Sequence, residues 1–255
     1  MKQLNLKHCT IYSPAYLEYK KAATLFGYKL HIIDRFEDRY EEVKENSFVI
    51  FVNPSTPDGM FYGTNKLLEQ WKKKKCTVLI DESFIEFTPF RSATTLLHRF
   101  PNLYILKSMT KFFGAAGIRV GTLISQAQNI KLLQDTEPLW KLSTFDSTYI
   151  QAVIKDKNFK VNSHQKNLQS KSYLIDILDN SDIVEKRYPS HANYILIELK
   201  DITAKELQEK LLPHKVMVRS CENFDGLGAY HIRIAVKSID DLEKFKEAFM
   251  EAFCA

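Results

Sequence analysis

The sequence predicts an α/β protein, with a mostly parallel sheet flanked by helices in a large domain and a small α+β domain at the C-terminal end. Its 255 residues are 45% hydrophobic, with only 8 Gly and 8 Pro. This composition is typical of a globular chain and excludes collagen-like and low-complexity classes. In the first half, short apolar runs alternate with longer helical patterns, as parallel strands joined by crossover helices do.

Six apolar runs in the first half have the length and composition of buried strands. They cover residues 9–12, 29–33, 48–52, 77–80, 103–106 and 121–124. The segments between them predict helices at residues 15–26, 62–74 and 95–100. The last of these ends before Pro101, because the residue that precedes a proline is disfavoured in a helix. Since ligands bind at the carboxyl ends of the strands in such sheets, we expect functional side chains there.

A polar, helix-compatible stretch from residue 126 to about 173 separates this region from the rest of the chain. Beyond it the pattern predicts strands at 194–199, 216–219 and 231–236 and helices at 204–212 and 239–253. Ser238 is placed to cap the last helix. We therefore divide the chain into a large domain (1–127), a helical connection (128–172) and a small domain (173–255).

The net charge of +5 comes from 36 Lys and Arg against 31 Asp and Glu. Part of this excess lies in the four consecutive lysines at 72–75, which follow a helical pattern. Cations at the C-terminal end of a helix are favoured by its dipole, so a solvated helix end explains the run better than a nucleic-acid patch. We expect no nucleic-acid partner.

Four cysteines (Cys9, Cys76, Cys221 and Cys254) lie far apart, without a C-x-x-C pair. This spacing indicates neither a zinc site nor a disulfide framework, and it favours reduced thiols in the cytoplasm. The first eight residues lack the apolar core of a signal peptide, and no apolar run approaches the span of a bilayer. The sequence therefore predicts a cytoplasmic protein without a metal site or a membrane partner.

One candidate functional residue, Asp81, follows the apolar run that ends at Ile80. A carboxylate at the end of a buried strand is costly unless a cation or a hydrogen-bond donor faces it. A protonated pyridine nitrogen would be such a partner. The alternative is an aspartate that only caps the following turn.

A second candidate, Lys111, lies among aromatic and small residues in the segment 106–121, LKSMTKFFGAAGIRVG. Desolvation of a lysine removes its charge and makes its amine a nucleophile that can form a Schiff base. Ser108, Thr110 and Arg119 surround it in the sequence and have the hydroxyl and guanidinium groups that suit a phosphate. The segment has no GxGxxG pattern, so it does not indicate a dinucleotide site.

Residues 108–121 resemble the lysine-attachment signature of class I and II aminotransferases, the fold-type I enzymes that use pyridoxal 5'-phosphate (PLP). Asp81 lies thirty residues before Lys111, as the family's aspartate that faces the pyridine nitrogen does. Residues 53–59, NPSTPDG, resemble the family's Asn-Pro-x-Asn-Pro-x-Gly loop. Residues 14–19, PAYLEY, look like the segment whose aromatic residue stacks on the cofactor.

The resemblance implies that Lys111 attaches to PLP and later moves protons at the substrate Cα, and that Asp81 keeps the ring nitrogen protonated. It also implies that Tyr16 stacks on the ring. The implied cofactor-binding residues are Tyr16, Thr56, Asp81, Ser108, Thr110, Lys111 and Arg119.

Two arginines near the C-terminal end point to the substrate. The segments 218–227, VRSCENFDGL, and 232–236, IRIAV, resemble the end of threonine-phosphate decarboxylases. Histidinol-phosphate aminotransferases share the spacing of the two arginines. The resemblance implies that Arg233 pairs with the substrate carboxylate and Arg219 with a distal phosphate. The alternatives without a ligand are that Tyr16 is an aromatic residue of the core and that Arg219 forms a surface ion pair.

Two side chains differ from the family pattern. Thr56 stands where the family has a second loop asparagine, and Phe84 stands where a tyrosine is usual. Both changes remove potential donors to the phenolic oxygen of the cofactor.

The chain is also shorter than the family, and no glycine precedes Gly27. We expect the large domain to lack its N-terminal strand, helix and glycine-rich phosphate loop. By resemblance the protein is a homodimeric PLP enzyme that acts on a phosphorylated amino acid or amine, by transamination or decarboxylation. The alternative is a truncated, catalytically impaired homologue that acts only as a binding or dimerising protein.

Overall fold

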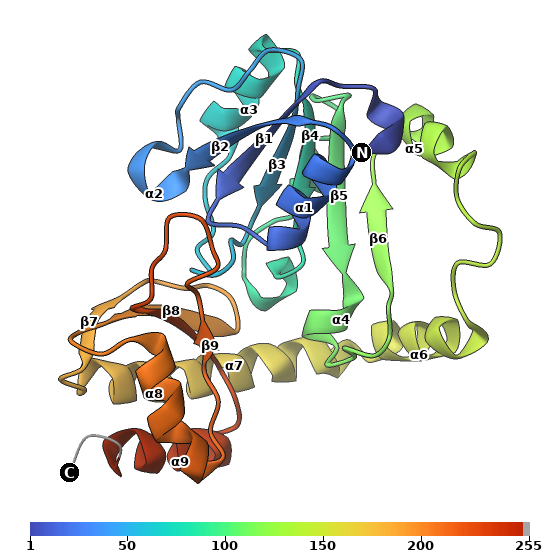
Figure 1. Ribbon diagram of the computed structural model, residues 1–255. Helices are drawn as coiled ribbons and strands as arrows, with labels where there is room; N and C mark the ends of the chain where they lie inside the picture. Colours follow the sequence, from blue (N-terminus) through green and yellow to red (C-terminus); the bar gives the residue numbers. More distant parts are fainter. Residues whose placement is uncertain (252–255) are drawn as a thin grey trace.

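The computed structural model describes residues 1–251 and contains two sheets, which lie one above the other in Figure 1. The larger sheet has six strands in the order β2-β1-β3-β4-β5-β6. Its strands are β1 (His8–Ser13), β2 (Lys29–Asp34), β3 (Ser47–Val52), β4 (Thr77–Asp81), β5 (Leu103–Ser108) and β6 (Gly121–Ile124). Neighbouring strands are parallel except β5 and β6. The predicted mostly parallel sheet is confirmed, and all six strand ends agree with the prediction within two residues.

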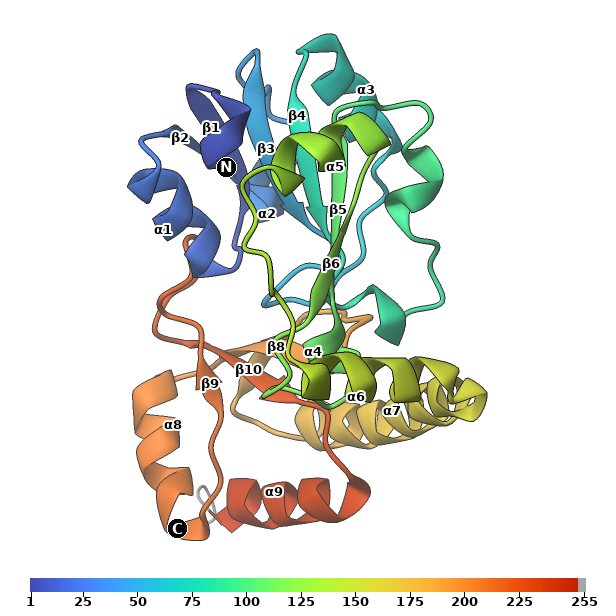
Figure 2. The same ribbon diagram turned by 90° about the vertical axis from the view of Figure 1, so that its right-hand side faces the viewer.

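Helices cover both faces of this sheet, which explains why its central strands are apolar throughout. Every residue of β3 is buried, as expected for a strand that is covered on both sides. The helix α1 (Leu17–Leu25) buries Ala23 against one face, and α3 (Asn65–Lys73) buries Trp71 against the other. Figure 2 shows these two helices on opposite sides of the sheet.

Shorter helical elements connect the strands of the large sheet. They are α2 (Arg35–Asp38), α4 (Met109–Phe112) and 3-10 turns at Lys2–Leu4, Ile85–Phe87 and Ala93–Leu96. The helix predicted at 95–100 is wrong, because only the 3-10 turn that ends at Leu96 forms there. Its first amides are taken by side chains: Ala93 N donates to Glu82 and Thr94 N to Ser92. Within residues 1–251, no helix is long and apolar enough to cross a membrane.

The smaller sheet is antiparallel, with the order β7-β8-β10-β9. It consists of β7 (Val184–Arg187), β8 (Tyr194–Leu199), β9 (Arg219–Ser220) and β10 (His231–Ala235). The strand predicted at 216–219 is reduced to β9, and β7 was not predicted because its sequence, VEKR, lacks an apolar run. Two helices, α8 (Ala204–Leu211) and α9 (Ile239–Glu251), pack on this sheet, with a 3-10 turn at Leu212–His214. Residues 252 and 253 of the predicted last helix, and Cys254, lie outside the described residues.

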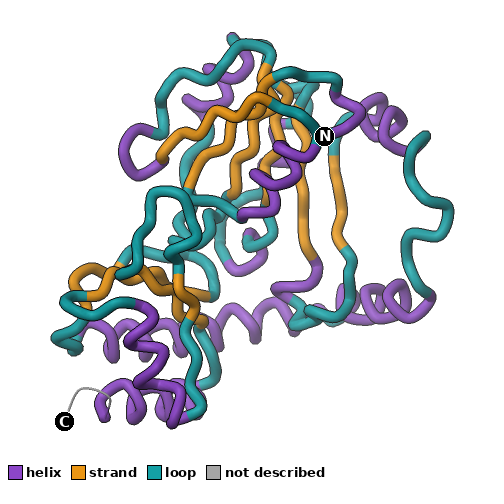
Figure 3. The backbone as a smooth tube through the Cα atoms, in the orientation of Figure 1, coloured by secondary structure: helices purple, strands orange, loops and turns teal. Residues whose placement is uncertain are grey.

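Three helices join the two sheets: α5 (Ala127–Gln134), α6 (Thr144–Lys155) and α7 (Lys157–Asp179). Figure 3 shows a loop that descends from α5 to α6, and the long α7 then runs under the large sheet into the small lobe. Leu174 and Leu178 of α7 are completely buried in the core of that lobe. The domain boundaries stay a prediction; the one at residue 172 lies within α7.

Replacing Leu174 by alanine should destabilise the small lobe, because Leu174 is completely buried in its core and the shorter side chain leaves a cavity there. We expect a loss of about 3 kcal/mol in the free energy of unfolding, measured by urea denaturation. Leu168→Ala on the same helix is the control: its residue is 66% exposed, and the expected change is within about 0.5 kcal/mol. Equal effects of the two substitutions would contradict the packing described for α7.

Candidate active site

A cavity of about 560 Å³ lies between the carboxyl edge of the large sheet and the strands β9 and β10 of the small lobe. In Figure 1 the arrowheads of β1, β3 and β5 point toward the small lobe, so the ends of these strands face it. All nine side chains singled out in the sequence line this one cavity. They are Tyr16, Thr56, Asp81, Ser108, Thr110, Lys111, Arg119, Arg219 and Arg233.

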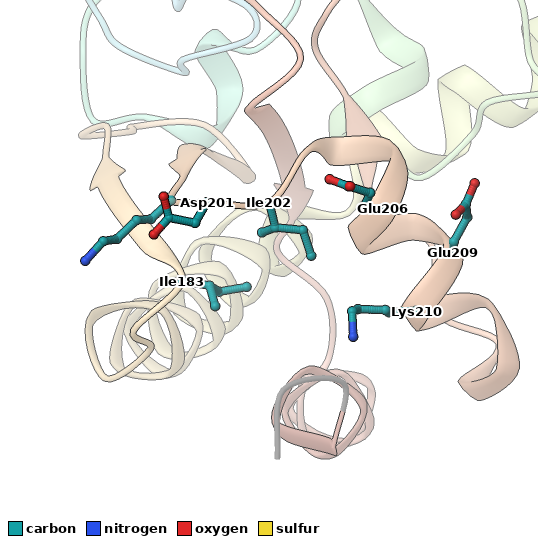
Figure 4. A pocket seen from close by; sticks show the side chains of 7 residues that line it. Ile183, Asp201, Ile202, Glu206, Glu209 and Lys210 are labelled. Carbon is teal, nitrogen blue, oxygen red and sulfur yellow. The ribbon is translucent and has the colours of Figure 1, made fainter. Parts of the chain in front are cut away.

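Figure 4 shows another hollow, of about 660 Å³, in the small lobe beside α8. It is larger, but none of the nine side chains lines it. One of its carboxylates, Glu206, accepts from the backbone N and the hydroxyl of Thr203 and thereby caps α8. We therefore place the candidate site in the cavity between the lobes.

Asp81 ends β4 at the floor of the cavity and is only 5% exposed. Its Oδ1 accepts from the Ser83 amide at 2.9 Å and the Ser83 hydroxyl at 2.5 Å. Its Oδ2 accepts from the Tyr19 hydroxyl at 2.6 Å. The turn-capping role that the sequence left open is therefore present, and the same carboxylate also lines the cavity. These three donors offset the cost of burying the charge.

Lys111 lies in α4, the short helix that begins where β5 ends. The Ser108 hydroxyl accepts from the Thr110 amide and starts this helix. The Lys111 Nζ donates to the Thr110 hydroxyl at 3.0 Å. Burial, followed by the positive charge of Arg119, lowers the pKa of Lys111, although Asp81 opposes this. At a given pH, a larger fraction of this amine is therefore neutral than in a solvated lysine, and the neutral form is the nucleophile.

Three guanidinium groups line the same cavity as the amine and have no carboxylate partner among the described residues. Arg119 donates to a backbone carbonyl at 3.1 Å, and Arg219 donates to the amide oxygen of Asn223 at 3.2 Å. Arg233 donates to the Thr56 hydroxyl at 3.0 Å and lies over the Tyr194 ring. Among the described residues, none of the three forms an ion pair. Together with Lys111 they bring more positive charge to the cavity than the single carboxylate of Asp81 balances. The cavity therefore favours an anionic ligand.

The remaining predicted residues lie at the rim and the wall. The ring of Tyr16 is 54% exposed at the N-terminal end of α1. Thr56 is buried in the loop 53–59, which the side chain of Asn53 ties to the backbone of Tyr62. The sequence reasoning missed Tyr19, although it follows Tyr16 by three residues, a spacing that places both on one face of a helix.

The sequence matches the family described as aminotransferase class I and II over residues 7–249. The chain belongs to this family. It is 26% identical to histidinol-phosphate aminotransferase of Methanocaldococcus jannaschii over 93% of this chain and 66% of that protein. Four further histidinol-phosphate aminotransferases, among them that of Methanothermobacter thermautotrophicus, are matched over 56–60% of their length. The chain thus spans less than two thirds of the length of these relatives.

Solved structures show the same fold over nearly the whole chain. The histidinol-phosphate aminotransferase of Clostridium acetobutylicum superposes with a TM-score of 0.88, at 27% identity, and covers 97% of this chain and 78% of that one. The L-threonine-O-3-phosphate decarboxylase of Porphyromonas gingivalis gives 0.86 at 22% identity, with 98% and 79% covered. Because its identity is low, the second likeness supports the fold alone.

Replacing Arg119 by glutamine should raise the pKa of Lys111, because it removes the second-largest cause of the lowered value. With a higher pKa, a smaller fraction of the amine is neutral at a given pH. Competitive acetylation of Lys111, followed by mass spectrometry, should then have its pH midpoint displaced upward. Arg91→Gln, at an exposed position, is the control and should leave the midpoint unchanged. An unchanged midpoint in the Arg119 variant would contradict the described electrostatics.

Proposed function

We propose that this chain binds PLP in the cavity between its lobes and acts on a small amino acid or amine that carries a phosphate. The observation that carries the proposal is the convergence in that cavity of Lys111, Asp81 and three arginines that pair with no carboxylate of residues 1–251. The family to which the chain belongs is PLP-dependent. The relatives named above carry enzyme names, so they give no support to the reading as a binding protein without turnover.

The donor set of the cavity fits PLP. Arg119 and the hydroxyls of Ser108 and Thr110 are cationic and polar donors of the kind that holds a phosphate. Asp81 is a buried carboxylate suited to a protonated ring nitrogen, and Lys111 is a lysine of this cavity whose pKa is lowered by burial and then by Arg119. Tyr16 and Thr56 would contact the cofactor from the rim and the wall.

When bound, PLP would supply an aldehyde for a lysine amine and a ring that withdraws electrons from the substrate Cα. In this arrangement Lys111 holds the cofactor and then moves a proton at Cα. Asp81 keeps a proton on the ring nitrogen. Arg233, on the small lobe, would bind the carboxylate of threonine phosphate or of the glutamate formed by transamination, because a guanidinium matches a carboxylate with two parallel hydrogen bonds.

Arg219 lines the same cavity and would bind the distal phosphate of the substrate. Support comes from relatives whose names specify histidinol phosphate and, for a protein of Caldanaerobacter subterraneus that is 29% identical, threonine phosphate. Their reactions differ in which bond at Cα breaks. The residues of the cavity suit both reactions, so we propose either of them for this chain. A homodimer and a cytoplasmic location stay predictions, and sedimentation equilibrium tests the first.

The attachment of PLP is tested by adding PLP to the purified chain and reducing with borohydride. We expect a mass increase of one reduced PLP, located by peptide mapping at Lys111 and absent in Lys111→Ala. Lys107, the other lysine that lines the cavity, is the internal control, because its amine forms an ion pair with Glu86 at 3.4 Å. Labelling at Lys107, or undiminished labelling in Lys111→Ala, would refute the assignment.

The substrate is tested with threonine phosphate alone and with histidinol phosphate plus 2-oxoglutarate. Release of carbon dioxide identifies a decarboxylase, and formation of glutamate identifies an aminotransferase. Arg219→Gln should raise KM for the phosphorylated substrate roughly tenfold or more, because a charge-assisted hydrogen bond is lost. Arg187→Gln is the control, since that guanidinium pairs with Asp179 on the surface. An unaltered KM in the Arg219 variant would contradict its role.

A further inference from the structure

Tyr19 contacts the carboxylate at the floor of the cavity, although 62 residues separate the two in the sequence. It lies on α1, one helical turn after Tyr16, and it lines the cavity. The rings of Tyr16 and Tyr19 meet edge to face, with centroids 6.0 Å apart. Through its hydroxyl, α1 is thus connected to the end of β4.

Asp81 is held from two sides. The Ser83 amide and hydroxyl bind Oδ1, whereas Oδ2 accepts from the Tyr19 hydroxyl. A carboxylate has about four acceptor positions, so three are used and the last one is on Oδ2. The two Ser83 bonds fix one oxygen, and the Tyr19 bond then fixes the plane of the group. Without Tyr19, Oδ2 has no donor among the described residues.

The chemistry of the hydroxyl agrees with this geometry. Burial, and then the neighbouring negative charge of Asp81, raise the pKa of Tyr19 far above its usual value. The hydroxyl therefore keeps its proton and acts as a donor. A short bond from a neutral donor to a carboxylate is stronger than a bond between neutral groups.

We propose that Tyr19 is a positioning residue for Asp81: its hydroxyl holds the carboxylate so that the free acceptor position of Oδ2 serves the ring nitrogen of the cofactor. This inference rests on the proposed function, because it requires PLP in the cavity. Tyr19 acts through Asp81. Removal of the Tyr19 hydroxyl should therefore weaken PLP binding only while the Asp81 carboxylate is present.

The experiment is a double-mutant cycle of Tyr19→Phe and Asp81→Asn, with the dissociation constant for PLP and the absorbance of the bound cofactor as readouts. Tyr19→Phe removes only the hydroxyl, and we expect PLP to bind about tenfold more weakly, which is the size typical of partners that orient a ligand-holding side chain. The absorbance band should also be displaced. In the Asp81→Asn background, the same substitution should change the dissociation constant less than about twofold. Tyr28→Phe is the matched control, because that hydroxyl donates to the backbone of Met1 at 2.8 Å, outside the cavity.

Urea unfolding of the apo variants checks that each of them folds. A tenfold effect that disappears with Asp81→Asn supports the positioning role. If Tyr19→Phe binds PLP as the wild type does, or if the two effects add, the inference is overturned and the proposed function stands. If the wild type itself does not bind PLP, the proposed function and the inference both fall.

Discussion

The burial of one negative charge is the constraint on which the arrangement of the cavity depends. Asp81 ends a central strand at 5% exposure, and such a charge is tolerated only where donors and cations face it. The donors come from Ser83 and Tyr19, and the cations come from both lobes. Because Lys111 and the three arginines exceed this single carboxylate, the cavity keeps an excess of positive charge. Burial, and then the charges of Arg119 and Arg233, lower the pKa of Lys111, and the excess of positive charge attracts an anion.

Both lobes contribute charged residues to the cavity. Contacts between the loop 53–59 and the small lobe hold the two lobes together. The Tyr194 hydroxyl donates to Ser55 O at 2.6 Å, and the His191 amide donates to Gly59 O at 2.8 Å. Gly59 has φ +76°, and a Cβ there would overlap the Ser190 hydroxyl. Only glycine therefore lets the loop approach the small lobe this closely. Away from this loop, Lys20 of α1 pairs with Asp225 at 2.7 Å and adds a second bridge.

Much of the fold could be predicted from the sequence because its central strands are covered on both faces. Continuous apolar runs such as that of β3 follow directly from this burial. The edge strand β7 has two exposed residues and no apolar run, so local pattern could not reveal it. Asp81 was predictable because it follows an apolar run, and Lys111 because it lies among aromatic and small residues in a segment that resembles the family's lysine-attachment signature. Tyr19 was not, because its partner is on another element and only the packing of α1 against the sheet brings the two together.

Thr56, which replaces the family's second loop asparagine, has a hydrogen-bond partner that the sequence does not indicate. A hydroxyl has one donor where an amide has two, which suggested a weaker contact with the cofactor. The structure gives Thr56 a partner that donates to it, since Arg233 Nη1 lies 3.0 Å from its oxygen. An oxygen that accepts from a guanidinium keeps its own hydrogen for another acceptor. The Thr56 hydroxyl also forms a hydrogen bond with Tyr194, so Thr56 holds the arginine of one lobe from the loop of the other.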